Sequence, residues 1–126
     1  MPYLMRMKVG PKADGLSTSE YHELGRVFDM REKEVFIHGE PVGWEEIEEV
    51  ELVVAPQVGG LSSWILSKFV DMQDRYHLGI YLKRDEAVLA NISKPQALYA
   101  LNAIAYNAPN LVRYNGPDGF APLTGY

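Results

Sequence analysis

Three histidines are the side chains of this chain best suited to metal binding or acid–base chemistry. They are His22, His38 and His77, which come from an expected loop, a hairpin strand and a late strand. None has a second histidine or a carboxylate at the spacing of a recognised metal motif, and His22-Glu23 lacks the partner histidine of a helical zinc motif. We interpret all three as structural or surface residues, and we predict no catalytic residue, no metal and no cofactor.

A run of carboxylates is the second candidate for chemistry, because it suits a cation or a basic partner. It places five glutamates in seven residues: Glu45, Glu46, Glu48, Glu49 and Glu51. Strand alternation sends Glu49 and Glu51 to one side, opposite Val50 and Leu52, as on an ordinary exposed face. Calcium needs about six to eight oxygen ligands, which one strand cannot supply. We therefore interpret the run as a solvated strand face.

The segment from Gly59 to Trp64 combines glycines with serines, as phosphate loops and serine nucleophiles do. It has no P-loop lysine, and no G-x-S-x-G elbow occurs in the chain. We interpret it as a turn into the apolar stretch 61–70, whose spacing fits a helix and whose bulk fits a buried strand; we favour the strand.

An aromatic stripe offers the best candidate binding surface. Tyr99, Asn102 and Tyr106 lie at three- and four-residue spacing, so they share one stripe of an expected helix. With Trp64 and the tail residue Phe120, they are the candidate interaction residues. Two interpretations stay open: a peptide groove or dimer contact, and packing of the tail over the helix within one chain, since a buried tyrosine needs only one polar partner.

The helix that carries this stripe is the clearest helix signal in the chain. Ser93 and Gln96 have the spacing of a capping box, and Pro95 is tolerated in a first turn. Pro109 disfavours helical geometry at the residue before it. The sequence predicts one C-terminal helix over 94–107, with an apolar stripe that must bury against a sheet.

The rest of the chain is expected to be strands and loops. Residues 11–25 are interpreted as a loop with a possible one-turn helix start at 17–20. Strands are expected at 3–9, 26–30, 34–38, 42–44, 50–54, 76–83 and 87–92, with a helical turn at 44–47. The sequence predicts an α+β fold of mostly antiparallel β-structure, a bent sheet or partly open barrel capped by the C-terminal helix. Residues 1–109 form this single domain, and 110–126 form a tail that packs on it or on a neighbouring subunit.

This succession of short strands, a late hairpin and a capped helix resembles the bacterial pleckstrin-homology-like (PH-like) domains. The string from Val35 to Val50 resembles the hairpin and tryptophan–acidic–x–isoleucine step of such domains. The resemblance implies a helix-capped barrel, a fold that hosts lipid, peptide and self-association functions. Phosphoinositide-binding members use basic residues between the first two strands, whereas here Lys12 stands with Asp14, Glu20 and Glu23, which argues against binding of a lipid headgroup.

Composition limits the classes of function. The chain has 126 residues, enough for one domain, and 17 acidic against 12 basic residues give a net charge of -5. This charge opposes the phosphate attraction behind nonspecific nucleic-acid binding, so we predict no nucleic-acid partner. The absence of cysteine excludes disulfides, thiolate nucleophiles and cysteine-ligated metals.

No apolar run approaches the roughly 20 residues of a transmembrane helix. Charges interrupt the apolar N-terminus, unlike a signal peptide. We therefore expect a soluble protein, with the cytoplasm as its default location.

These observations favour a noncatalytic protein-interaction or self-assembly module. The alternative is a domain that binds a small apolar ligand or lipid through residues such as Leu61, Trp64, Ile65 and Phe69. A third possibility is an enzyme whose carboxylates or histidines converge only in the folded chain.

Overall fold

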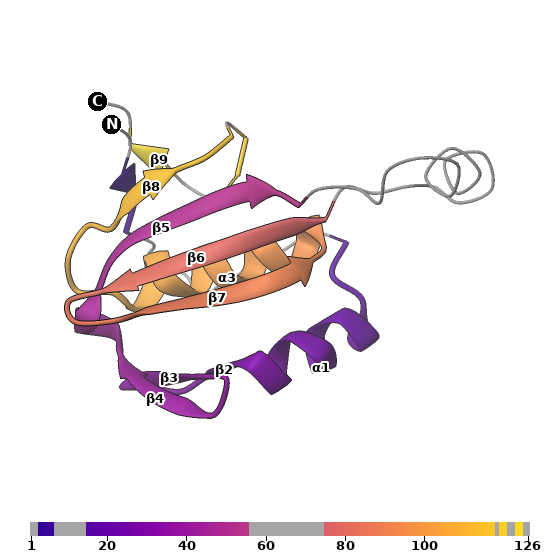
Figure 1. Cartoon of the computed structure of the whole chain (residues 1–126), viewed down its shortest axis with the longest axis horizontal. Helices are drawn as coiled ribbons and strands as arrows, with labels where there is room; N and C mark the ends of the chain where they lie inside the picture. The colour runs from indigo at the N-terminus through magenta and orange to yellow at the C-terminus, as the bar shows by residue number, and fades with distance from the viewer. Residues whose placement is uncertain (1–2, 7–14, 56–74, 118, 121–122, 125–126) are drawn as a thin grey trace.

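The computed structural model describes residues 3–6, 15–55, 75–117, 119–120 and 123–124 (Figure 1). Two helices occur in this part of the chain, α1 (Thr18–Val27) and α3 (Lys94–Asn107), together with a single 3-10 turn, η1 (Trp44–Glu46). The strands are β1 (Tyr3–Leu4), β2 (Phe28–Met30), β3 (Glu34–Ile37), β4 (Glu40–Gly43), β5 (Ile47–Val54), β6 (Tyr76–Leu82), β7 (Glu86–Ile92), β8 (Arg113–Asn115) and β9 (Leu123–Thr124).

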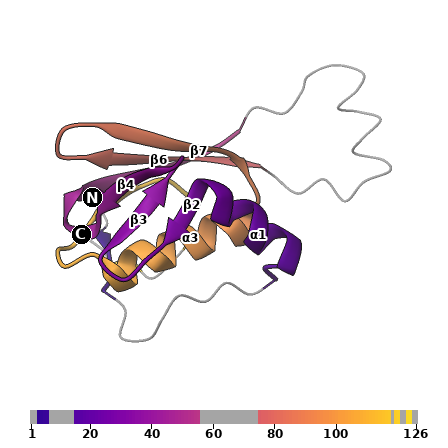
Figure 2. The same ribbon diagram turned by 90° about the horizontal axis from the view of Figure 1, so that it is seen from below.

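The strands form two open sheets. The larger has the order β7-β6-β5-β8-β1-β9, and the smaller has the order β2-β3-β4. Neighbouring strands are antiparallel except for β5 and β8, which are parallel. Helix α3 lies against one face of the larger sheet, and α1 and the smaller sheet lie beside it (Figures 1 and 2). The predicted α+β class, a bent and partly open sheet capped by the C-terminal helix, is confirmed.

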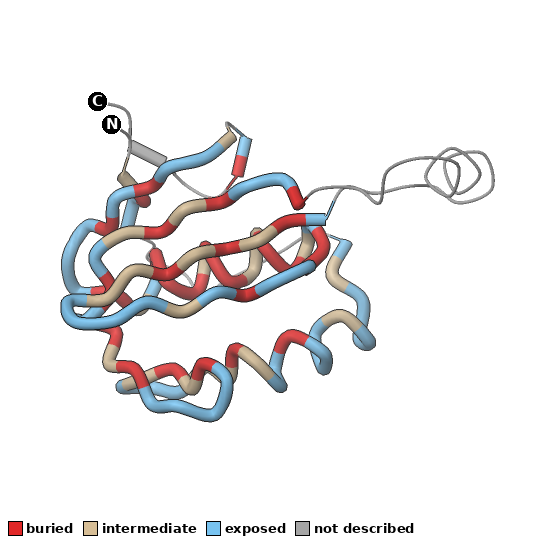
Figure 3. Tube along the Cα trace, viewed as in Figure 1, coloured by how far each residue is buried: buried red, intermediate tan, exposed pale blue. Residues whose placement is uncertain are grey.

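The core lies between α3 and the larger sheet (Figure 3). Alternation buries Leu78 and Ile80 of β6 together with Val50 and Leu52 of β5. The facing positions of α3 are mostly alanines with no exposed surface, so helix and sheet approach closely. The hairpin of β6 and β7 pairs Leu78 with Leu89 and Gly79 with Val88. Both the hairpin and α3 occur where the sequence predicts them.

Helix α1 corrects the sequence interpretation, which has a loop over residues 11–25. Ser17 and Glu20 form a reciprocal capping box: the Glu20 amide donates to Ser17 Oγ at 3.1 Å, and the Ser17 amide donates to Glu20 Oε1 at 3.1 Å. The loop prediction was wrong because it depended on apolar periodicity. The segment is polar overall, and its apolar stripe is limited to Tyr21, Leu24 and Val27, of which only Leu24 is fully buried.

The first turns of the two helices are joined through Glu20. Its second carboxylate oxygen accepts a hydrogen bond from the Ser93 hydroxyl, and Gln96 Nε2 donates to the Glu20 carbonyl at 2.9 Å. Ser93 is the N-cap of α3, where its Oγ accepts from the Gln96 amide at 3.3 Å. The bond from Ser93 is the main reason that the pKa of Glu20 is lowered. One carboxylate thus stands at two helix N-termini, where a negative charge is favourable.

Strands β8 and β9 belong to the larger sheet, and both come from the segment 110–126 that the sequence predicts as a tail. Strand β8 inserts between β5 and β1, with Tyr114 opposite Val50. Tyr114 is fully buried, and its hydroxyl donates to the Pro117 carbonyl at 2.6 Å. A Cβ at Gly116 would lie 2.7 Å from the Leu52 carbonyl oxygen, so the chain closes onto β5 only with glycine there.

Other predicted elements agree with the structure at lower precision. The hairpin expected at 26–38 is β2 and β3, but Arg26 and Val27, predicted as strand, are the last residues of α1. The edge strand near 42–44 is β4, and the helical turn at 44–47 is η1. The strand favoured at 61–70 and residues 7–9 of the first predicted strand lie outside the described residues. In the described part of the chain, no helix has the length and apolar character needed to cross a membrane.

Replacing Ser93 by alanine removes the N-cap of α3 and also the hydroxyl that donates a hydrogen bond to Glu20. We expect the free energy of unfolding at neutral pH to fall by about 2 kcal/mol, since an N-cap contributes about 1 kcal/mol and a hydrogen bond to a charged group contributes about as much again. Urea denaturation measures the change. The control is Ser19→Ala, an exposed serine in the first turn of α1, which should stay within about 0.5 kcal/mol of the original chain.

Measuring the effect of Ser93→Ala in acid separates the contribution of the N-cap from that of the hydrogen bond to Glu20. The pKa of Glu20 is lowered from 4.5, so the link stabilises the fold fully above that pH and is lost as the pH falls through the lowered pKa. The Ser93→Ala penalty should therefore shrink in acid. A penalty of the same size at neutral and acidic pH would contradict the Glu20 link and leave only the N-cap.

Candidate functional site

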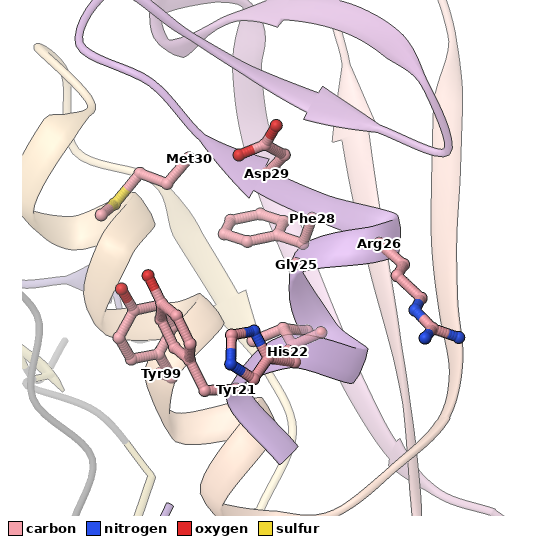
Figure 4. A pocket seen from close by; sticks show the side chains of 9 residues that line it. Tyr21, His22, Gly25, Arg26, Phe28, Asp29, Met30 and Tyr99 are labelled. Carbon is pink, nitrogen blue, oxygen red and sulfur yellow. The ribbon is translucent and has the colours of Figure 1, made fainter. Parts of the chain in front are cut away.

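A pocket lies where α1, β2 and α3 meet, and it is the best candidate site in the described residues (Figure 4). Its volume is 360 Å³. Residues from α1 and β2 form most of the lining, and α3 contributes one. The lining residues are Tyr21, His22, Leu24, Gly25, Arg26, Phe28, Asp29, Met30 and Tyr99.

Two tyrosines from different helices form one wall. The rings of Tyr21 and Tyr99 meet edge to face at 89°, with centroids 5.8 Å apart. The Tyr21 ring also contacts the His22 ring at 5.7 Å. In Figure 4 both tyrosine hydroxyls point to the side of the pocket where Met30 lies. This wall is aromatic in its body and polar at its tip, a combination that interfaces use often.

Burial changes the chemistry of one of these tyrosines. Tyr99 is partly buried, and burial raises the pKa of its hydroxyl. The negative charge of a Tyr21 phenolate and a hydrogen bond with Tyr21 raise this pKa further. Tyr21 is half exposed, at 50%. The Tyr99 hydroxyl is therefore a neutral hydrogen-bonding group at physiological pH, not a base.

The opposite wall is held by contacts to η1 and to α3. The Phe28 ring meets Trp44 with centroids 6.3 Å apart, and Trp44 Nε1 donates to the Arg31 carbonyl at 3.1 Å. Asn107 Nδ2 donates to Met30 Sδ at 3.5 Å, which orients the thioether. The wall thus combines a fixed aromatic ring with a polarizable, adaptable side chain.

The charged residues of the lining turn away from the pocket. In Figure 4 the side chain of Arg26 and the carboxylate of Asp29 both extend outward. Asp29 pairs with Arg31 at 2.7 Å, and the hydrogen bond from that guanidinium lowers the pKa of the carboxyl. The groups that face the interior are two tyrosine hydroxyls, one imidazole and apolar surface. This arrangement suits binding of an apolar or aromatic group that carries a polar atom.

One of the five predicted interaction residues lines this pocket. Tyr99 does so, whereas Asn102 and Tyr106 lie further along α3, with Tyr106 44% exposed. Phe120 is buried, and its ring packs on Tyr76 at 5.2 Å between centroids, with the Lys94 ammonium 5.4 Å from the ring. Trp64 lies outside the described residues. The structure therefore separates Phe120 from the tyrosine stripe.

Sequence reasoning missed the pocket residues of α1 and β2. Tyr21 and His22 were assigned to a loop, so nothing brought them near α3. The spacing of Ser17 and Glu20 is the signal that could have found the helix, since it is the same capping box that identifies α3.

The three histidines lie apart, each in its own contact. His38 Nε2 is 2.7 Å from the Val88 carbonyl, and His77 Nδ1 accepts from the Asn91 amide at 2.9 Å. Among the described residues, no group of three histidine, aspartate or glutamate side chains is arranged to hold a metal ion.

Carboxylates of the glutamate run make separate local bonds. Glu49 pairs with Arg113 at 2.9 Å, and Glu51 accepts from the Tyr81 hydroxyl at 2.8 Å on the same face of the sheet. Glu46 Oε2 accepts from the Gly43 amide at 2.9 Å. These bonds hold the sheet surface and the turn that leads into it.

Comparison with family models, curated proteins and solved structures gave no significant match. The resemblance to PH-like domains stays a prediction.

The pairing of the two tyrosines is testable by titration. We expect Tyr99 to ionise above pH 10.0, because burial and the Tyr21 hydroxyl both raise its pKa. Tyr21→Phe should lower that pKa part of the way, since burial remains. NMR of the ring carbons measures both, with Tyr99→Phe to assign the signal. A Tyr99 midpoint that Tyr21→Phe leaves unchanged would contradict the pairing.

Proposed function

We propose that this protein is a noncatalytic binding module that recognises another protein through the pocket between α1 and α3. The observation that carries the proposal is the Tyr21–Tyr99 wall, which joins two helices and stays accessible beside a pocket of 360 Å³. Tyr21 has a large aromatic ring, yet half of its surface is exposed to solvent. Tyrosine and tryptophan are enriched among the residues that dominate binding energy at protein interfaces.

The chemistry of the pocket supports recognition of an anchor side chain. Phe28 and Met30 supply an apolar wall, and the hydroxyls of Tyr21 and Tyr99 supply hydrogen bonds at one end. An aromatic or long aliphatic side chain of a partner fits this combination, because apolar burial gives affinity and the hydroxyls fix the orientation.

A second candidate is the binding of a small apolar ligand at the same place. The observation that favours it is the volume of the pocket, 360 Å³, which falls in the range of about 300 to 1,000 Å³ typical of small-molecule sites. The partner and the ligand differ in mass, so one experiment separates them.

Native mass spectrometry of the chain purified gently from its own cells tests the proposal. We compare the original chain with Tyr21→Ser, which removes the exposed half of the wall, and with Tyr106→Ser, an equally exposed tyrosine of α3 outside the pocket. The original chain and Tyr106→Ser should carry a protein partner, and Tyr21→Ser should lose most of it. Thermal unfolding of each variant checks that the fold is kept.

Each other outcome has a definite meaning. An added mass of a few hundred daltons that Tyr21→Ser removes would replace the protein partner with a small ligand. Masses at simple multiples of 14.2 kDa would indicate self-assembly instead. A partner retained equally by all three chains would contradict the assignment of this pocket.

A further inference from the structure

A second concave surface lies between the two sheets. One side is formed by the turn of β3 and β4 with η1, and the other by the hairpin of β6 and β7. Its volume is 550 Å³, and it shares no lining residue with the pocket between α1 and α3. We call it the β4–β7 groove. An inference about it is independent of the proposed function.

The charge of the groove has one sign. Four carboxylates line it, Glu40 and Glu46 from one side and Asp85 and Glu86 from the other, and no lysine or arginine is among its lining residues. Between them lies apolar surface from Val42, Leu82 and Ala87. The groove thus combines an acidic rim with an apolar floor, which complements a chain that is basic and apolar in alternation.

Among the described strands, none pairs with the β7 edge that faces the groove. Strand β7 is the last strand of the larger sheet, and its residues contact β6 on one side only. Val88 stands opposite Gly79 of β6, and its carbonyl points the other way, where it lies 2.7 Å from His38 Nε2 across the groove. A strand added at this edge would take the place of the imidazole, and its backbone amide would donate to the Val88 carbonyl.

The two facing edges differ in their ability to pair. Strand β4 contains Pro41, which has no amide hydrogen and protects an edge from strand addition. Strand β7 contains neither proline nor lysine, and Val88 is 47% exposed. An incoming strand therefore pairs with β7 and leaves β4 as the opposite wall.

We propose that the β4–β7 groove binds an extended, basic segment of a partner protein, which adds as a strand to the free edge of β7. Main-chain hydrogen bonds to β7 supply affinity without sequence preference, and the alternate side chains supply specificity. Glu86 pairs with Tyr81 on the outer face of the sheet, so the partner residues on that face meet a carboxylate. The other partner residues face Val42 and Ala87, which favours lysine or arginine alternating with valine or isoleucine.

Selection from a phage-displayed library of random heptapeptides tests this proposal on the whole chain. We expect the peptides recovered to be enriched in basic residues alternating with β-branched ones. NMR titration with the best synthetic peptide should shift the amides of β7 and of the β3–β4 turn and leave those of α1 unchanged.

Three variants make the outcome specific. Glu40→Lys with Glu86→Lys replaces one of the two carboxylates on each side of the groove, so the negative charge of the rim is cancelled. Binding of the peptide should weaken about ten-fold or more. The control Glu32→Lys changes an exposed carboxylate outside the groove and should have little effect. Val88→Pro removes the outward amide of β7 at an edge where proline is tolerated, and should abolish binding. Because the charge variants change only exposed side chains, the test does not depend on the proline variant folding.

The contrary results are equally definite. Recovery of no peptide, peptides without a basic preference, or binding that the two lysine substitutions leave unchanged would each overturn the proposal. Amide shifts confined to α1 and α3 would assign the peptide to the tyrosine pocket instead. Formation of dimers through β7, seen as a doubled mass that Val88→Pro removes, would replace the basic peptide with a second copy of the chain.

Discussion

The bond between Glu20 and Ser93 is the contact on which the position of the first turn of α1 depends. Helix α1 has one fully buried residue, Leu24, so apolar burial contributes little to its position. Its first turn is instead held by a carboxylate that also accepts a hydrogen bond from the N-cap of α3. Strand β2 follows α1 without a linker, and the smaller sheet is held in addition by its own core residues, Phe28, Val35, Ile37 and Val42. Each capping box is local in sequence, but the bond between them joins the first turns of α1 and α3, which lie far apart in the chain.

Both candidate binding surfaces arise where α1 and the smaller sheet meet the rest of the fold. The pocket lies on the side where α1 meets α3, and the β4–β7 groove lies where the smaller sheet approaches the free edge of the larger one. The sheet of β5 to β7 with α3 carries the dense core and supplies a fixed frame. The first surface is aromatic and the second acidic, so they suit partner segments of different chemistry.

Elements with strong local signals could be predicted from the sequence, and those defined by tertiary contacts could not. Period-two alternation identified the β6–β7 hairpin, and a capping box with a flanking proline identified α3. Helix α1 has the same kind of cap but a short apolar stripe within a polar segment, so it was taken for a loop. Strand β8 has only three residues and lies close to glycines and prolines. It pairs with β5, some sixty residues earlier in the chain, and no local sequence pattern encodes a pairing over that distance. Tyr99 was found because its stripe lies on a predicted helix, whereas its partner Tyr21 comes from the helix that was missed.

The most direct measurement is the nuclear Overhauser effect between the ring protons of Tyr21 and Tyr99, compared in the original chain and in Glu20→Ala. Glu20 holds α1 through its carboxylate, so the effect should be clear in the original chain, where the centroids are 5.8 Å apart, and much weaker in the variant. Contacts within α3 should persist in both, which separates a displaced α1 from a lost fold. An unchanged effect between the two rings in Glu20→Ala would show that α1 is placed by other contacts, and would contradict the role assigned here to the Glu20–Ser93 bond.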